Sequence, residues 1–336
     1  MRWNKAMTTS SRNIHIRAHP AMSDVPEAVA GQHMHRAIAP HLGKDPWPYA
    51  SALIRHSGFR EALRLYCAST IQPSETAWPA DKFFGQKLRY LVSFVLIGLD
   101  ARWRRGEGDA PTLAVLQRIA PASARQIAAL VGALKLGGYI VASQLPEDRR
   151  AQRLSPSMAL LQAIGRSPLA FLKASEQLDA AAPASLTTLR LDVCEMGDWL
   201  GASYEMFSQE DVYFAPFPNI VEFTGQDCGY PVLLAVLAAH YAALANVPAP
   251  AHLSYRGLAE RFRVSQQHIR NVLGNAERRG CLSVGHGGAS VTVSTDFLSE
   301  FETWAAGQMA HYRLLAERVL SVARPLNSLA GSVPGD

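Results

Sequence analysis

Side chains that can form paired hydrogen bonds cluster between residues 265 and 278. They are Ser265, Gln266, Gln267, His268, Arg270, Asn271, Asn275 and Arg278. Amides of Gln and Asn match the major-groove edge of adenine, and an Arg guanidinium matches guanine or a phosphate. We therefore expect these residues to contact double-stranded DNA. The alternative is a polar, solvated helix without a partner.

The elements that would position these side chains follow from periodicity. Apolar residues at 269, 272, 273 and 276 predict a helix with one buried face. Ser265 stands at its N-cap, and Gly280 follows its end. A shorter helix over 255–262 precedes it after a tight turn, so the pair is typical of a helix-turn-helix. Strands over 281–284 and 290–293, around the glycine-rich residues 285–288, complete a winged helix.

The same pattern occurs earlier in the chain. Helices are predicted over 112–119 and from Ser123 onward, with apolar residues at 127, 130, 131 and 134. Strands over 139–143 and 152–155 then flank a charged tip at 147–150. A shift of 142 residues superimposes the two patterns without a gap from 91/233 to 140/282, which indicates an internal repeat. Long helices are predicted after each hairpin, over 157–178 and 295–322.

The two copies differ in chemistry. Where the second copy has Gln266, Gln267, Arg270 and Asn271, the first has Ala124, Arg125, Ala128 and Ala129. Alanine cannot distinguish bases by hydrogen bonding. We expect the second copy to supply most base specificity and the first to bind phosphates. The candidate residues in the first copy are Ser123, Arg125, Lys135, Arg149, Arg150 and Arg153. The alternative for its wing is an exposed hairpin in which Asp148 pairs with Arg150.

Residues 181–226 form an acidic, aromatic connector. Net charge is −8 over 174–226, against +8 over 81–173. An acidic segment beside a basic one suggests a part that faces away from a polyanion. Two interpretations stand for its aromatic residues. One is a pocket for a small aromatic effector, lined by Arg190, Trp199, Tyr204 and Phe207, and the other is packing that braces the two halves.

Composition narrows the class of protein. The chain has 336 residues, of which 48% are hydrophobic, and no apolar run long enough for a membrane span. The start lacks a secretory leader, and the four cysteines show no CxxC spacing, so we expect a cytoplasmic protein with reduced thiols. Nucleotide-binding, hydrolase and zinc-protease motifs are missing from the sequence. We therefore expect no enzyme activity, no cofactor, no metal site and no membrane partner.

The predicted fold class is mainly α with small β wings (α+β), in two tandem winged helix-turn-helix domains. The expected organisation is a flexible basic segment (1–44), a first winged-helix domain (45–180), the connector (181–226), a second winged-helix domain (227–325) and a flexible tail (326–336). Within the first domain, helices are expected from Asp45 to Ser69 and from Asp81 to Arg105.

The stretch 123–155 resembles a known family. Its Gly138-Tyr139-Ile140, followed by Glu147-Asp148-Arg149-Arg150-Ala151 and Arg153-Leu154-Ser155, is similar to the wing of MarR-type transcriptional regulators. The resemblance extends from about Pro111 to Arg166. It implies a winged-helix fold, dimers and control by small aromatic ligands. The second wing lacks Asp-Arg, and the chain is about twice the usual family length. Both departures suggest a fused, pseudo-twofold version.

These observations favour a sequence-specific transcriptional regulator that reads an imperfect inverted repeat of double-stranded DNA. It would be nucleoid-associated when bound, as a monomeric pseudo-dimer or a homodimer. The two reading helices should lie about 34 Å apart, one turn of DNA. The first alternative is a plasmid-type replication initiator, which also carries two winged helices. The second is a protein that uses winged helices for protein contacts.

Overall fold

The computed structural model describes residues 15–16, 34–72, 80–120, 122–146, 150–178, 192–209, 212–250, 253–285 and 290–329. The protein is mainly helical, with two small sheets. The coarse fold class predicted from the sequence is therefore confirmed. None of the helices in these ranges has the length and apolar character that crossing a membrane requires.

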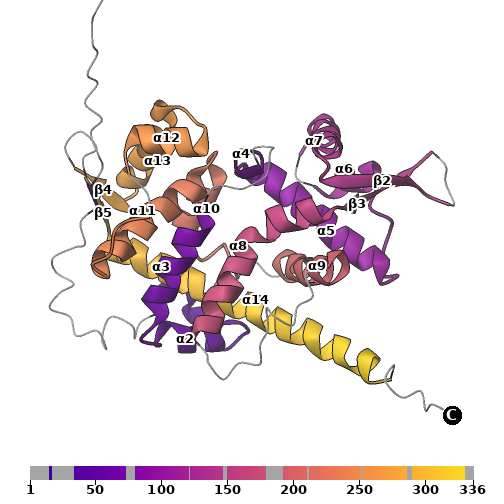
Figure 1. The fold of residues 1–336 in the computed structure, drawn as a ribbon, viewed down its shortest axis with the longest axis horizontal. Coiled ribbons are helices and arrows are strands. Elements are labelled where there is room, and N and C mark those ends of the chain that lie inside the picture. Colours follow the sequence, from indigo (N-terminus) through magenta and orange to yellow (C-terminus); the bar gives the residue numbers. More distant parts are fainter. Residues whose placement is uncertain are drawn as a thin grey trace, which may run out of the picture.

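One order of elements occurs twice (Figure 1). The first copy contains α5 (Lys87–Arg104), α6 (Leu113–Ile119), α7 (Ala124–Leu136), β2 (Ile140–Gln144), β3 (Gln152–Pro156) and α8 (Met158–Gln177). The second contains α11 (Gly229–Leu244), α12 (Tyr255–Phe262), α13 (Gln266–Arg278), β4 (Leu282–Val284), β5 (Ser290–Val293) and α14 (Thr295–Leu329). From the leading helix to the first strand, equivalent elements begin 142 residues apart, as the repeat predicts.

The second helix of each pair begins and ends for the same physical reasons. The Ser123 hydroxyl accepts a hydrogen bond from the backbone N–H of Gln126, and the Ser265 hydroxyl accepts one from His268. Each satisfies a donor that the first helical turn leaves free. Two residues after each helix lie Gly138 and Gly280, with φ of 71° and 73°. This left-handed conformation favours glycine and turns the chain into the hairpin.

Both hairpins are antiparallel. In the first, Ile140 lies opposite Pro156, and in the second Leu282 lies opposite Val293. A two-residue strand, β1 (His15–Ile16), runs parallel to β5 and widens the second sheet to three strands in the order β1-β5-β4. Most of the two tips predicted at 147–150 and 285–288 lies outside the described residues, which include only Arg150 of the first and Gly285 of the second.

The remaining helices differ from the predicted boundaries. They are η2 (Arg36–His41), α2 (Trp47–Ile54), α3 (Phe59–Thr70), α4 (Ala80–Phe84), α9 (Val193–Gln209) and α10 (Pro218–Gly225). The helices expected over 45–69 and 81–105 are each interrupted. The segment 1–44 is not flexible throughout, because the side chain of Ile38 in η2 is fully buried. The last helix also extends beyond 325, into the expected tail.

A helix upstream of each copy packs against the leading helix of the other copy. α3 lies against α11, and α9 lies against α5, while α14 crosses α8. The connector expected over 181–226 thus contains a central helix of the fold. Buried residues from both copies belong to one hydrophobic cluster. The boundaries placed at 180 and 227 therefore do not separate two independent cores.

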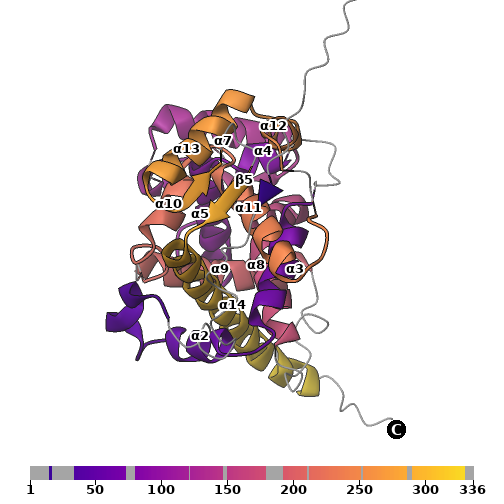
Figure 2. The ribbon, with the colours of Figure 1, turned by 90° about the vertical axis from the view of Figure 1, so that its left-hand side faces the viewer.

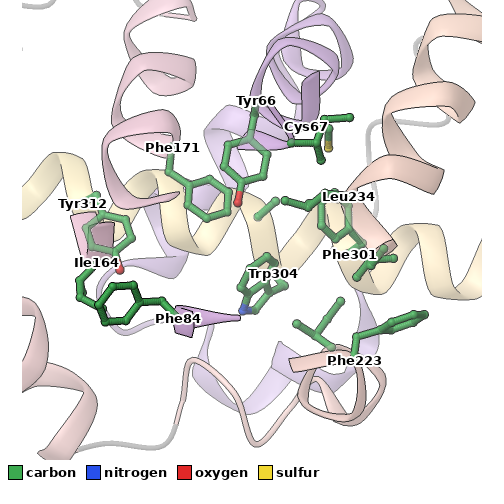
Figure 3. Close-up of a cluster of buried hydrophobic side chains, with 14 of the residues drawn as sticks. Tyr66, Cys67, Phe84, Ile164, Phe171, Phe223, Leu234, Phe301, Trp304 and Tyr312 are labelled. Atoms are coloured by element: carbon green, nitrogen blue, oxygen red, sulfur yellow. The ribbon is translucent and has the colours of Figure 1, made fainter. Parts of the chain in front are cut away.

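Aromatic side chains fill the place where these helices meet (Figure 3). The ring of Phe171 stacks on Tyr66 with centroids 3.9 Å apart, and Trp304 meets Phe171 edge-on at 5.5 Å. These residues come from α8, α3 and α14, so one aromatic cluster ties the first copy to the last helix. Figures 1 and 2 both place α7 and α13 on one side of the molecule and α2 and α14 on the other.

Candidate nucleic-acid interface

The outward face of α13 is polar and exposed. Ile269, Val272, Leu273 and Ala276 are buried on the opposite face, which fixes the rotation of the helix about its axis. The side chains left exposed on α13 are Gln266, Gln267, Arg270, Asn271, Glu277 and Arg278. The Glu277 carboxylate accepts from the backbone N–H of Val284 at 2.7 Å, and the other five can form paired hydrogen bonds. The structure therefore brings five of the eight residues predicted in this region onto one accessible surface.

Two contacts hold this surface in place without neutralising it. The Gln267 amide Nε2 donates to Asn271 Oδ1 at 2.9 Å, one helical turn away. The Arg270 guanidinium lies 5.3 Å from the ring centroid of Tyr255, the first residue of α12. A cation–π contact at an exposed site contributes only about 0.5–1 kcal/mol. The guanidinium keeps its charge and can turn toward a ligand.

Three of the predicted residues serve the helix itself. Ser265 is the N-cap, as described above. The His268 ring Nε2 lies 2.6 Å from the carbonyl of Asp227, and the Asn275 amide Nδ2 donates to Glu222 Oε1 at 2.8 Å. These contacts attach α13 to α10 and to the turn after it. His268 and Asn275 thus orient α13, and their ring and amide are not free for base edges.

The equivalent face of α7 is apolar. Arg125 is exposed, but its neighbours Ala124, Ala128 and Ala129 are exposed too. Beyond them, Leu136 is 89% and Val141 59% exposed. At the 142-residue offset these five small or apolar residues correspond to Gln266, Arg270, Asn271, Arg278 and Ser283. The contrast between the copies thus extends past the first turn, to a leucine and a valine that sequence reasoning did not single out.

The cations assigned to the first copy have different environments. Lys135 is exposed, and its Nζ donates to Gln152 Oε1 on β3 at 2.9 Å. Arg150 is exposed, whereas Arg149 lies outside the described residues. Arg153 is turned inward: its Nη2 donates to Asp100 Oδ1 at 2.9 Å. The same guanidinium lies 3.8 Å from the ring centroid of Trp103.

The prediction that Arg153 binds phosphate is therefore corrected. Asp100 on α5 is 6% exposed and also accepts from Arg104 Nε at 3.1 Å. A buried carboxylate needs such partners, because desolvation otherwise disfavours its charge. Arg153 fixes the second strand of the wing to α5. Arg104 extends the network to Asp198 on α9, at 2.8 Å.

The aromatic residues proposed to line an effector pocket are packing residues. Trp199 is 1% exposed, and its indole Nε1 donates to the carbonyl of Tyr312 at 3.2 Å. The Tyr204 ring meets Phe94 edge-on at 5.9 Å, and the Phe207 ring stacks on His311 at 4.6 Å. These contacts join α9 to α5 and α14. Arg190, the fourth proposed residue, lies outside the described residues.

The described ranges contain no group of three or more His, Cys, Asp or Glu side chains placed to hold a metal ion. The cysteines are free thiols: Cys67, Cys228 and Cys281 are buried and Cys194 is exposed. Burial raises the pKa of the Cys281 thiol to about 11, which disfavours the reactive thiolate.

Comparison with known proteins leaves the interface to be judged on its geometry. No protein-family model matches the chain, and neither a curated protein nor a solved structure shows significant similarity to it.

Proposed function

We propose that the protein is a sequence-specific, double-stranded DNA-binding transcriptional regulator, built on two tandem winged helix-turn-helix units of MarR-like type. The observation that carries the proposal is the exposed row Gln266, Gln267, Arg270 and Asn271. It lies on the second helix of a capped helix pair, beside a hairpin. Side chains of this kind on such a helix match base edges in the major groove.

The position of the second unit supports a bipartite site. α7 and α13 lie on one side of the molecule in both views, so one duplex could meet both helices (Figures 1 and 2). A pseudo-twofold pair of units would read an inverted repeat with half-sites about one helical turn apart. One chain would then present two reading helices to the duplex, as a dimer does in the MarR-type family that the sequence resembles. Because the faces of α7 and α13 differ, the repeat would be imperfect.

In this proposal the two units have different roles in DNA binding. α13 provides hydrogen-bonding readout. α7 provides Arg125 and Lys135 for the backbone, and its exposed alanines are suited only to apolar contact with thymine methyl groups. Arg153 has no direct part, since it is paired with Asp100. We propose no aromatic effector in the α9 region, because Trp199 and Phe207 are engaged in the core.

Fluorescence anisotropy with a labelled duplex pool of random central sequence tests DNA binding. We expect affinity to fall steeply with salt, since each neutralised phosphate adds about 0.9 to the slope of log K against log salt. The variant Arg270→Ala/Asn271→Ala should weaken binding to a preferred sequence by about tenfold or more, from a loss of about 1–3 kcal/mol per paired contact.

The matched control is Arg55→Ala, which removes an exposed cation beside α2, on the other side of the molecule. It should leave affinity unchanged. Binding that is absent at low salt, or insensitive to salt, would overturn the proposal and favour a winged-helix protein that binds other proteins. A preference for direct repeats would favour the replication initiator.

A further inference from the structure

Three cations that none of the functions above employs flank the α4–α5 turn, with Lys82 in α4 and Lys87 and Arg89 in the first turn of α5. Lys82 and Lys87 are exposed, and Arg89 is half-buried. Among the side chains that the structure describes, no carboxylate is paired with any of the three. The Arg89 guanidinium lies over the ring of Phe83, 4.6 Å from its centroid. The ring holds the guanidinium in place but does not neutralise its charge.

Contacts attach this turn to the first unit. Phe84 meets the ring of Tyr139 edge-on at 5.0 Å, and Phe83 lies parallel to the same ring at 6.4 Å. Tyr139 lies three residues after the end of α7, and its backbone N–H donates to the carbonyl of Leu134 within α7 at 2.9 Å. The turn is therefore anchored directly beside the C-terminal end of α7.

Contacts also attach the turn to the second unit. The carbonyl of Gly85 accepts from the backbone N–H of Cys228 at 3.4 Å. The residue before it, Asp227, contacts the His268 ring of α13 through its carbonyl, and the Cys228 thiol points to the carbonyl of Phe262 in α12 at 3.6 Å. The α4–α5 turn is thus linked by single residues to both helix pairs.

Figures 1 and 2 agree with these contacts. α4 lies on the side of the molecule that carries α7 and α13, and in Figure 1 it lies between them. A duplex that spans the two helices would pass this turn at the middle of its site. The backbone there carries phosphates that neither α7 nor α13 reaches, because each reads its own half-site.

The cations belong to one turn only. At the 142-residue offset, Lys82, Lys87 and Arg89 correspond to Thr224, Gly229 and Pro231, which have no charge. The equivalent segment 222–231 carries Glu222 and Asp227, whereas 80–89 carries one carboxylate, Asp81, beside the three cations. The three cations are therefore not a general feature of the repeated unit.

We propose that the α4–α5 turn is a third DNA-contacting element, at which Lys82, Lys87 and Arg89 bind phosphates of the segment between the two half-sites. The inference rests on the proposed function. Its ligand is the phosphodiester backbone of double-stranded DNA, recognised by charge and without base contacts. The turn would fix the register of the duplex across both units and contribute affinity that depends steeply on salt.

The test compares the wild type with Lys82→Gln/Lys87→Gln/Arg89→Gln on one duplex selected by the wild type. Affinity is measured against KCl concentration, and phosphate contacts are mapped by ethylation interference. We expect the salt slope of the variant to fall by about two to three, from about 0.9 per lost phosphate. Central ethylation interference should disappear, while the preferred bases stay the same.

Two further variants of the protein serve as controls. Lys82→Gln/Lys87→Gln changes only exposed residues, so it should keep its melting temperature and lower the slope by about two. Arg55→Gln/Arg64→Gln/Lys173→Gln removes the same charge from α2, α3 and α8 and should leave the slope unchanged. An unchanged salt slope and intact central ethylation interference in both the triple variant and Lys82→Gln/Lys87→Gln would overturn the inference. If the wild type itself bound no DNA, the proposed function would fail as well.

Discussion

At the scale of single residues, the two units differ most at Arg270-Asn271 and Ala128-Ala129, and in the proposed function this contrast would decide which bases each unit reads. Both pairs are exposed, at equivalent positions on helices that each begin at a serine N-cap. The backbone frame is therefore shared, and only the side chains differ. A guanidinium and an amide can discriminate bases, whereas two methyl groups cannot do so by hydrogen bonding.

Grafting the second face onto the first unit tests this point. Ala128→Arg/Ala129→Asn adds two exposed side chains to α7 and should change the free energy of unfolding by less than about 1 kcal/mol. We expect binding-site selection with the variant to show sharper base preference in the weaker half-site, with the stronger half-site unchanged. Selected sites identical to those of the wild type would show that α7 does not face bases.

Two buried histidines make the fold sensitive to acid. Burial lowers the pKa of His311 to about 3 and that of His240 to about 4, with smaller contributions from Arg318 and Arg60. In the unfolded chain both pKa values lie near 6.5. As pH falls below that value, the unfolded chain binds protons that the folded chain does not, so stability falls by about 1.4 kcal/mol per pH unit for each histidine.

Urea unfolding at pH 7.5 and 5.0 should therefore show a loss of about 4 kcal/mol from the two rings together. Burial raises the pKa of Glu302, which acts in the opposite direction because its folded carboxyl takes up a proton first. His240→Leu removes a ring whose nitrogens have no partner among the described residues. We expect it to halve the acid loss and to stabilise the protein at pH 7.5. An acid loss as large as that of the wild type would contradict this account.

At the scale of elements, the β2–β3 hairpin is held by a buried charge. Asp100 on α5 accepts from Arg153 of β3 and from Arg104. Asp100→Ala would leave two guanidinium groups without their buried partner. We expect a loss of about 3–5 kcal/mol in the free energy of unfolding, measured with urea. The control Asp109→Ala breaks an exposed pair with Arg118 and should cost less than about 1 kcal/mol. Equal effects would show that the Asp100 network does not support the wing.

The sequence predicted elements well where the causes are local. The bounds of α12 and β5 were predicted to the residue, and α13 was placed correctly by its serine cap and apolar spacing. The breaks after α2 and α4 were not predicted. The first is local: the Gly58 N–H donates to the His56 ring at 3.0 Å, at a Ser57-Gly58 pair of the kind that marks turns. The second is not local, because Phe83 and Phe84 pack on Tyr139, which is far away in the sequence.

The same difference between local and long-range causes explains which features of the candidate site the sequence predicted. Exposure of Gln266, Gln267 and Arg270 followed from the periodicity of α13. The inward turn of Arg153 depends on Asp100, 53 residues away, and the position of Asn275 depends on Glu222, also 53 residues away. Such partners cannot be assigned from one sequence, because spacing along the chain does not show which helices meet.

At the scale of the whole molecule, exchanged helices make the two units interdependent. α3 packs on α11 and α9 packs on α5, so each half completes the core of the other. We expect fragments 34–178 and 192–329 to be largely unfolded when produced separately, because each would expose the apolar surface that its missing partner covers. Mixing them should restore helicity in far-UV circular dichroism. Cooperative folding of either fragment alone would contradict this view of a shared core.

The interdependence has a functional meaning if the protein binds one bipartite site. A shared core fixes the distance between α7 and α13, as a dimer interface would, and so fixes the spacing of the half-sites. Flexible domains joined by a linker would accept several spacings. The two units would thus act as one rigid reader.

Selection of binding sites from random duplex DNA, with the wild type and with Gln267→Ala/Arg270→Ala/Asn271→Ala, shows whether two non-equivalent units read one bipartite site. We expect the wild type to enrich an imperfect inverted repeat with one fixed spacing. The variant should lose base preference in one half-site only. Loss of preference in both half-sites, enrichment of direct repeats, or no enrichment at low salt would contradict this expectation.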